Sequence, residues 1–193
     1  MANSTATPNL LQDPGFLFWA PLATAEPVNT VVASVFTDAW PVAWINLGAT
    51  KEGNAFTAET SVEPVKVAEL FDPVRWNTVD RISSIEFALA DVNLANLKKA
   101  MNGGTLTVVS GLTTTTLSSY TPPTPGSEVR SMIGWESLDA TVRLICYQCL
   151  QGGAISFENR RRPEYAAIAC KFNLEAPTSG IPFKFYTAGT ARG

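Results

Sequence analysis

The sequence lacks histidine altogether. Histidine is the most frequent general base in enzymes and the most frequent metal ligand, so its absence excludes Ser-His and Cys-His nucleophile pairs and most metal centres. The chain also has no glycine-rich phosphate loop, and its acidic residues do not have the pattern of a catalytic pair. The sequence therefore predicts a protein that is not an enzyme and that holds no cofactor and no metal.

Positive charge is also scarce, since the first basic residue is Lys51 and the formal net charge is −3. A secretory signal peptide begins with positive charge, and a membrane helix needs a far longer apolar run than Phe16-Leu17-Phe18-Trp19, which Pro21 ends. We therefore expect synthesis in the cytoplasm, without a signal peptide and without a membrane partner. A weakly acidic chain is also a poor candidate for tight binding of nucleic-acid phosphates.

Cysteine is limited to three residues, of which Cys146 and Cys149 form a C-x-x-C pattern. Redox versions of this pattern lie at the N-terminus of a helix, which lowers the thiol pKa. Here the pattern lies in a predicted strand, 141–150, in which residues three apart face opposite sides. A metal site would need more ligands, and Cys170 is the one cysteine left. We interpret all three as packing residues.

Apolar residues make up 46% of the 193 residues, which is enough for a sizeable core in a single domain, 1–193. Residues 1–40 are expected to form an extended N-terminal arm, because small and polar residues are followed by aromatics among prolines that prevent long regular structure. The aromatics must still leave water, so we expect them to lie on a neighbouring surface. They are Phe16, Phe18, Trp19, Phe36 and Trp40.

A second unusual segment, 62–70, separates apolar residues by charged ones and contains Pro64. Proline lacks an N–H group, so this segment is either an edge strand or a projecting loop. An exposed apolar strand needs a partner chain. We therefore expect a subunit interface in and next to this segment, shared with the N-terminal arm. The interface candidates are Val62, Val65, Val67, Leu70, Phe71, Phe16 and Trp19.

The rest of the chain is expected to form short strands around one helix. Residues 82–90 alternate, so Ile85, Phe87 and Leu89 should face the core while the opposite face meets water or a wet channel. A short helix should begin after Asn93 and stop at Gly103. Many strands with a single helix indicate a mainly β fold, a β-sandwich or barrel with one short flanking α-helix.

Several short motifs follow one another along the chain. They are Gly15-Phe16-Leu17-Phe18-Trp19, Trp44-Ile45-Asn46-Leu47-Gly48-Ala49-Thr50, Phe56-Thr57, Asp72-Pro73-Val74, Phe87-Ala88-Leu89-Ala90, Asn93-Leu94-Ala95-Asn96-Leu97, Gly103-Gly104, Ala167-Ile168-Ala169-Cys170-Lys171-Phe172 and Pro182-Phe183-Lys184-Phe185-Tyr186. Each motif is short, so only the occurrence of all of them in this order is specific for a family. Together they resemble the major tail tube proteins of long-tailed bacteriophages (siphophages), particularly those that infect actinobacteria.

This resemblance implies a β-sandwich with a flanking helix, six copies of which form a ring. It also implies a long interaction loop at 48–80 that reaches a neighbouring subunit or ring. The sheets of the six subunits would join into one barrel, and stacked rings would form a tube in the virion tail. Such a tube holds tape-measure protein, meets tail terminator and distal tail proteins, and passes double-stranded DNA without specific binding. Its lining should not be basic, so Ser84, Glu86 and Ala88 are the candidates for the lumen. Six copies of Glu86 per ring would add negative potential there.

Two other functions stay open at the level of the sequence. One is the tube of a contractile tail or of a related bacterial injection or secretion machine. The other is a monomeric β-barrel that binds a small ligand and stays small at high concentration. The run Arg160-Arg161-Arg162 also has two interpretations, a phosphate contact or a solvated hairpin tip that supplies intersubunit ion pairs.

Overall fold

A computed structural model describes residues 15–68, 71–110, 116–156 and 166–189. Across these ranges the chain forms twelve strands and one helix. The expectation of a mainly β chain with one short helix is therefore confirmed.

One eight-stranded antiparallel sheet forms most of the protein, in the order β4-β1-β9-β10-β11-β6-β5, with β12 paired to β10. Its strands are β1 (Gly15–Pro21), β4 (Ile45–Asn46), β5 (Thr50–Val65), β6 (Arg75–Leu89), β9 (Ser131–Ser137), β10 (Val142–Gln151), β11 (Ile168–Leu174) and β12 (Phe183–Thr187). Two separate hairpins are formed by β2 (Val31–Val32) with β3 (Val35–Phe36) and by β7 (Thr105–Ser110) with β8 (Thr116–Thr121).

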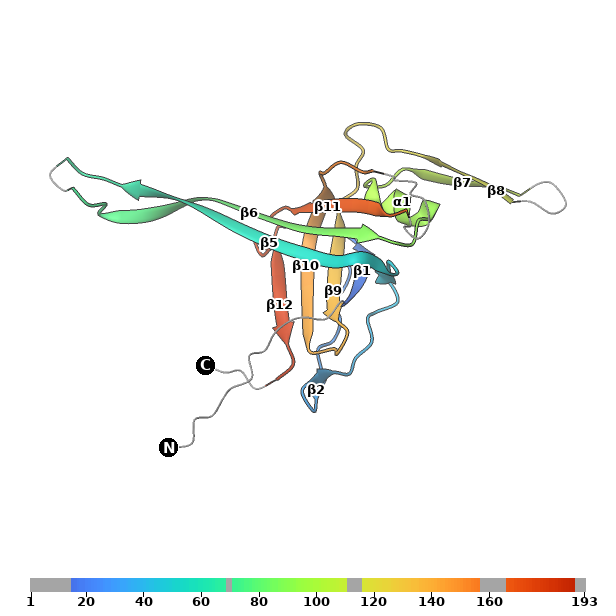
Figure 1. Cartoon of the computed structure of the whole chain (residues 1–193), viewed down its shortest axis with the longest axis horizontal. Coiled ribbons are helices and arrows are strands. Elements are labelled where there is room, and N and C mark those ends of the chain that lie inside the picture. The colour runs from blue at the N-terminus through green and yellow to red at the C-terminus, as the bar shows by residue number, and fades with distance from the viewer. Residues whose placement is uncertain (1–14, 69–70, 111–115, 157–165, 190–193) are drawn as a thin grey trace.

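Strand β10 divides the main sheet into two parts that cross. Its first half, Val142–Cys146, pairs with β12, whereas its end, Cys149–Gln151, pairs with β11. In Figure 1, β9, β10 and β12 run steeply, and β5, β6 and β11 pass across them. In the described part of the chain the strand order runs from β4 to β5 without closing, so these strands do not form a closed barrel.

The first core fills the space between the crossing strands. Side chains from β6 and β11 meet those from β1, β9 and β10 there. The expected core face of residues 82–90 is confirmed, because Ile85, Phe87 and Leu89 are 0%, 6% and 1% exposed. The rings of Phe87 and Phe172 stack with their centroids 5.7 Å apart. Period-two alternation at the end of β6 thus places Ile85, Phe87 and Leu89 in this core.

Residues 15–21 form a strand inside the sheet, which corrects the expectation of an extended arm over 1–40. Strand β1 pairs with β9 along its whole length and with β4 on its other side. Its side chains Leu17 and Ala20 are fully buried. Pro21 did not prevent this strand because it stands at the last position, where a missing N–H is tolerated. The part of the expected arm before Gly15 lies outside the described residues.

Residues 22–44 cover the outer face of the sheet and complete a second core there. Its buried members are Ala20, Trp44, Met132 and Ile145. Trp40 stacks on Phe18 with a centroid separation of 4.3 Å. Gly134 provides the room, because a Cβ at this position would lie 2.4 Å from the Trp40 ring. The surface expected for the N-terminal aromatics therefore belongs to the same subunit.

Helix α1 (Leu94–Ala100) begins and ends close to the predicted positions. The Asn93 side chain accepts a hydrogen bond from the backbone N–H three residues later at 2.7 Å, as an N-cap should. At the other end, Asn102 adopts the left-handed conformation with φ 56°. The N–H of Gly103 then donates to the carbonyl of Lys98 at 2.9 Å, which is the Schellman arrangement. Asn102, rather than the expected glycine, is thus the left-handed residue.

One buried amide fixes α1 to the body of the protein. Asn96 is 3% exposed and donates to the carbonyls of Leu47 at 3.2 Å and Asp91 at 2.9 Å. Ala100 is buried beside it, and Leu97 packs against the first core. A helix of this length is not stable alone in water, so these contacts hold it.

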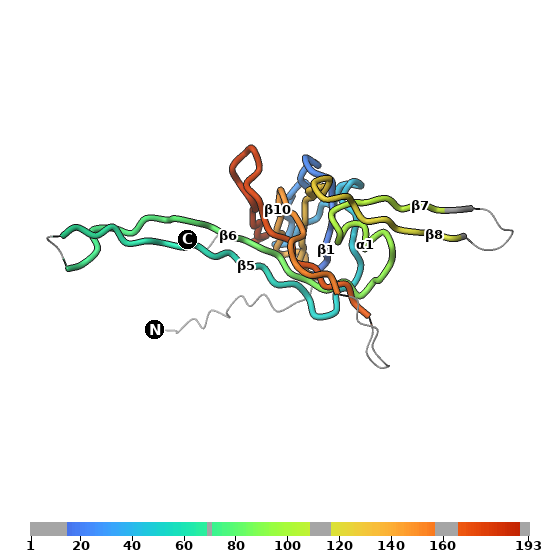
Figure 2. The backbone as a smooth tube through the Cα atoms, turned by 90° about the horizontal axis from the view of Figure 1, so that it is seen from above, coloured from blue at the N-terminus to red at the C-terminus, as the bar shows by residue number. Residues whose placement is uncertain are grey.

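Two hairpins project from the body in opposite directions (Figures 1 and 2). The shorter one is β7 with β8, and the longer one is β5 with β6. Segment 48–80, expected as a long loop, is therefore mostly regular strand, the edge-strand alternative. Pro64 is accommodated because β5 is the last strand in the described sheet order, and an edge position does not require its N–H.

Candidate functional site

The longer hairpin leaves the body as a two-stranded arm. Strand β6 pairs with β11 only over Ser84–Leu89; nearer the tip, among the described residues, it pairs with β5 alone. We call residues 58–83 the projecting arm. At a rise of about 3.4 Å per residue, the stretch from Arg75 to Ser83 extends about 30 Å.

The projecting arm exposes apolar side chains along its length. Phe71, in its turn, is 105% exposed, and Trp76 is 62% exposed. Val62, Val67, Val74, Val79 and Ile82 are 48%, 41%, 55%, 57% and 55% exposed. Single exposed apolar residues are ordinary, but this many on one arm, with Val62 and Trp76 diagonal neighbours across the hairpin, favour a surface that another molecule covers. The projecting arm is therefore the candidate site of assembly.

The structure places the predicted interface residues of the segment on this arm. Val62, Val67 and Phe71 are exposed, Val65 is half-buried, and the two cores contain none of these four. Leu70 lies outside the described residues. Sequence reasoning missed Trp76 and the valines beside it, although their alternation with Arg75, Asn77 and Asp80 is the same signal that identified Val62.

The two interface candidates from the N-terminal segment lie on the body instead. Phe16 and Trp19 both belong to β1. Phe16 is 43% exposed, whereas Trp19 is half-buried and packs against the first core. Trp19 therefore serves partly in the fold of its own subunit, which corrects its assignment to an arm.

The predicted lumen residues lie on the face of β6 opposite the first core. Glu86 is exposed, and its carboxylate lies 2.6 Å from the ammonium group of Lys171 on β11. Ala88 is half-buried, and Ser84, between its partners on β5 and β11, is only 6% exposed. This face is thus small and polar, and the neighbouring lysine neutralises the single carboxylate that was predicted to make it negative.

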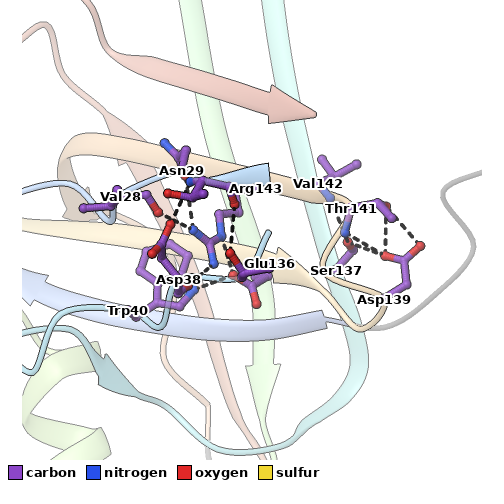
Figure 3. A network of polar contacts seen from close by, with 12 residues as sticks. Val28, Asn29, Asp38, Trp40, Glu136, Ser137, Asp139, Thr141, Val142 and Arg143 are labelled. Atoms are coloured by element: carbon purple, nitrogen blue, oxygen red, sulfur yellow. Dashed lines mark hydrogen bonds and ion pairs between the residues drawn. The ribbon is translucent and has the colours of Figure 1, made fainter. Parts of the chain in front are cut away.

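A buried arginine forms the densest polar network in the protein, shown in Figure 3. Arg143 is 1% exposed and donates through Nε to a carboxylate oxygen of Glu136 on the neighbouring strand. Its other nitrogens donate to the carbonyls of Val28, at 3.1 Å, and of Asp38. Trp40 donates its indole N–H to the same Glu136 carboxylate at 2.7 Å. The network therefore fixes residues 22–44 to β9 and β10.

A carboxylate fixes the same covering segment at a second point. Glu26 accepts hydrogen bonds from the hydroxyls of Tyr186 and Tyr147 and, at 3.2 Å, from the ammonium group of Lys184. Burial alone would raise the pKa of Glu26, but these three donors hold it below its usual value. Burial in turn raises the pKa of both tyrosines. Both polar networks thus have a structural role.

The three cysteines are reduced and buried. The ladder between β9 and β10 shifts register between Cys146 and Cys149, so the strand does not alternate regularly there. Both thiols therefore face the first core, which corrects the expectation that they face opposite sides. A hydrogen bond with Cys149, together with burial, raises the pKa of Cys146, and burial raises the pKa of Cys170 to about 12. Such thiols are poor nucleophiles and poor metal ligands.

Other chemistry finds little support in the described ranges. Within them, no group of three or more cysteine, aspartate or glutamate side chains is arranged to hold a metal ion. Over the same residues, no helix has the length and apolar character needed to span a membrane. The run Arg160-Arg161-Arg162 lies outside the described residues, so the phosphate contact and the solvated hairpin tip both stay predictions.

Neither a protein-family model nor a curated protein matches the chain.

Proposed function

We propose that this chain is a structural subunit of a tube, the major tail tube protein of a long-tailed bacteriophage. Six copies form a ring, and stacked rings form the hollow conduit through which the genome enters the host. The resemblance of the sequence motifs supports the family. The projecting arm is the single observation that carries the proposal, because assembly would remove its exposed apolar side chains from water.

The arm favours assembly on energetic grounds. Each large apolar side chain that moves from water into an interface contributes roughly 1.5–3 kcal/mol. Several such side chains line the arm, and Phe71 and Trp76 are the largest of them. In a tube the same contact repeats in every subunit, so a modest gain per residue stabilises a long assembly.

The open edges of the main sheet support the same conclusion. Strands β4 and β5 end the described strand order, and β5 offers one free side along its length. A free edge pairs readily with another chain, and closing strands into a shared barrel removes that edge. The strands of neighbouring subunits would then supply the wall that a single copy leaves open.

Negative-stain electron microscopy of the concentrated, purified protein tests the proposal. We expect six-fold rings in end-on views and hollow tubes of constant diameter in side views. Immunogold labelling should place the protein along the tails of virions. Analytical ultracentrifugation measures the oligomeric state in solution. If the chain stays monomeric at every concentration, and if labelling does not find it in virion tails, it is not a tube subunit.

A further inference from the structure

A pocket of about 600 Å³ lies beside helix α1, between the helix, β1 and the start of β7. Its lining is largely apolar and includes Trp19, Ile45, Ala95, Leu106 and Val129, and Lys98 and Lys99 add positive charge to it. Pockets of roughly 300–1,000 Å³ accept drug-sized ligands, so this one has ample room for an aromatic ring.

The best candidate to fill the pocket is a side chain of the projecting arm. Phe71 is fully exposed at the tip, so it makes no packing contact in its own subunit among the described residues. Asp72 follows it in the chain and is also exposed, so the residue next to the ring carries a negative charge. Lys98 is exposed at the pocket. An apolar ring with an adjacent carboxylate thus matches an apolar pocket with an adjacent ammonium group.

The two surfaces lie far apart in the molecule. Figures 1 and 2 both place the tip of the β5–β6 hairpin at one end and α1 on the other side of the body. A side chain at one end cannot fill a pocket beyond the body of the same copy. It can fill the pocket of the next copy, and a contact between two different surfaces repeats from copy to copy.

We propose that the pocket beside α1 receives the Phe71 side chain of a second copy of this chain, with Asp72 of the incoming copy against Lys98. This inference rests on the proposed function, because it names the receiving site for the arm within the tube. The pocket is then an intersubunit socket, and Trp19 contributes to the interface from inside its own fold.

Paired substitutions test the contact. Phe71→Ala removes the ring and Ala95→Trp fills the pocket, and each should raise the concentration needed for assembly by about tenfold or more. Phe71→Leu and Ala95→Ser are the matched controls and should assemble nearly as the native chain does. Phe71 and Ala95 are both exposed in the single copy, so circular dichroism and melting temperature should stay unchanged.

Charge exchange and cross-linking test the orientation. Asp72→Lys and Lys98→Asp should each weaken assembly, and the double variant should restore it. In the variant F71C/A95C, mild oxidation should give a ladder of covalent multimers on a non-reducing gel, because the three native cysteines are buried.

The outcomes separate this inference from the proposed function. If Phe71→Ala and Ala95→Trp form tubes as readily as the native chain, and if F71C/A95C gives no ladder, the socket is wrong. The proposed tube is unaffected by that result. A ladder with linear chains but no hollow tubes supports the socket and refutes the tube. A small apolar molecule bound in the pocket of assembled native protein would also overturn the socket, because the ring could not then occupy it.

Discussion

At the scale of single residues, Arg143 is a buried charge that joins residues 22–44 to the main sheet. Its guanidinium group is desolvated, and each of its nitrogens donates to a partner (Figure 3). The ring of Phe36 lies 4.6 Å from its central carbon and adds a cation–π contact. A buried charge without such partners would be costly, so the network makes its burial possible.

We predict that Arg143→Met destabilises the protein by about 3 kcal/mol or more. The methionine fills the space, but Glu136 keeps its charge in a largely buried position without the guanidinium group. Urea unfolding measures the change. Arg130→Met is the matched control, since its ion pair with Glu175 is exposed and should contribute about 1 kcal/mol or less. Equal effects of the two substitutions would contradict the central role of Arg143.

The cysteines allow a second test at this scale. Burial should keep all three thiols unreactive in the native protein, and the raised pKa values of Cys146 and Cys170 disfavour their thiolate forms. We expect a thiol reagent at pH 8 to label none of them until denaturant is added, and then to label all of them. Fast labelling of Cys146 or Cys149 in the folded protein would indicate a reactive pair and contradict a packing role.

Glu26 gives a prediction for the dependence of stability on pH. Its folded pKa lies below the ordinary value of 4.5, so the folded state binds fewer protons than the unfolded state in this range. The stabilisation is complete well above pH 4.5 and is lost as the pH falls through the lowered folded pKa. We expect Glu26→Gln to cost about 1 kcal/mol at pH 7 and progressively less below pH 4.5.

Chemical denaturation of the native chain and of Glu26→Gln between pH 3 and pH 7 measures this difference. Glu175 and Asp139 also have lowered pKa values, so both proteins should lose stability in acid. The gap between the two curves isolates Glu26. A gap that widens as the pH falls would refute the assignment.

At the scale of elements, the projecting arm should be separable from the body that carries it. Among the described residues, the two cores take no member from the stretch between Val62 and Ile82. We predict that the double substitution Val67→Asp and Phe71→Asp leaves far-UV circular dichroism and the melting temperature nearly unchanged. The same variant should not form tubes, because charge then replaces the apolar contact surface. Loss of the fold would show that these residues belong to the core of the subunit.

At the scale of the whole molecule, the face of β5, β6 and β11 opposite the first core is the surface we propose for the lumen. Its pair of Glu86 with Lys171 gives it little net charge, so DNA would meet a surface that neither attracts nor strongly repels it. We predict that Glu86→Lys slows genome release, because six added positive positions per ring would hold the phosphates. The delay should be greater at low salt than at high salt.

The rate of DNA release from virions at two salt concentrations measures this effect. Glu128→Lys, which makes the same charge change in the exposed segment before β9, is the control and should release DNA at the native rate. A tube structure with Glu86 on its outer wall would refute the lumen assignment whatever the kinetics.

The sequence by itself determined the features that depend on local pattern. Alternation fixed the core face of residues 82–90, because a strand turns every second side chain to the same side. Asn93 fixed the start of the helix, since its cap needs only a backbone N–H three residues away. Valines alternating with charge around Val62 indicated exposed strand for the same local reason.

Only the tertiary structure decided the features that depend on distant partners. Arg143 is buried because residues more than a hundred positions away supply its acceptors. In the sequence it is a single arginine between Val142 and Leu144, and this local pattern does not identify those distant acceptors. The irregular ladder at Cys149 turned both thiols inward, which no spacing rule foresees. The aromatics around Trp40 were expected to cover a neighbouring surface, and that surface proved to be strands of their own chain. Side chains must leave water wherever they lie, but the fold alone decides which surface removes them from it.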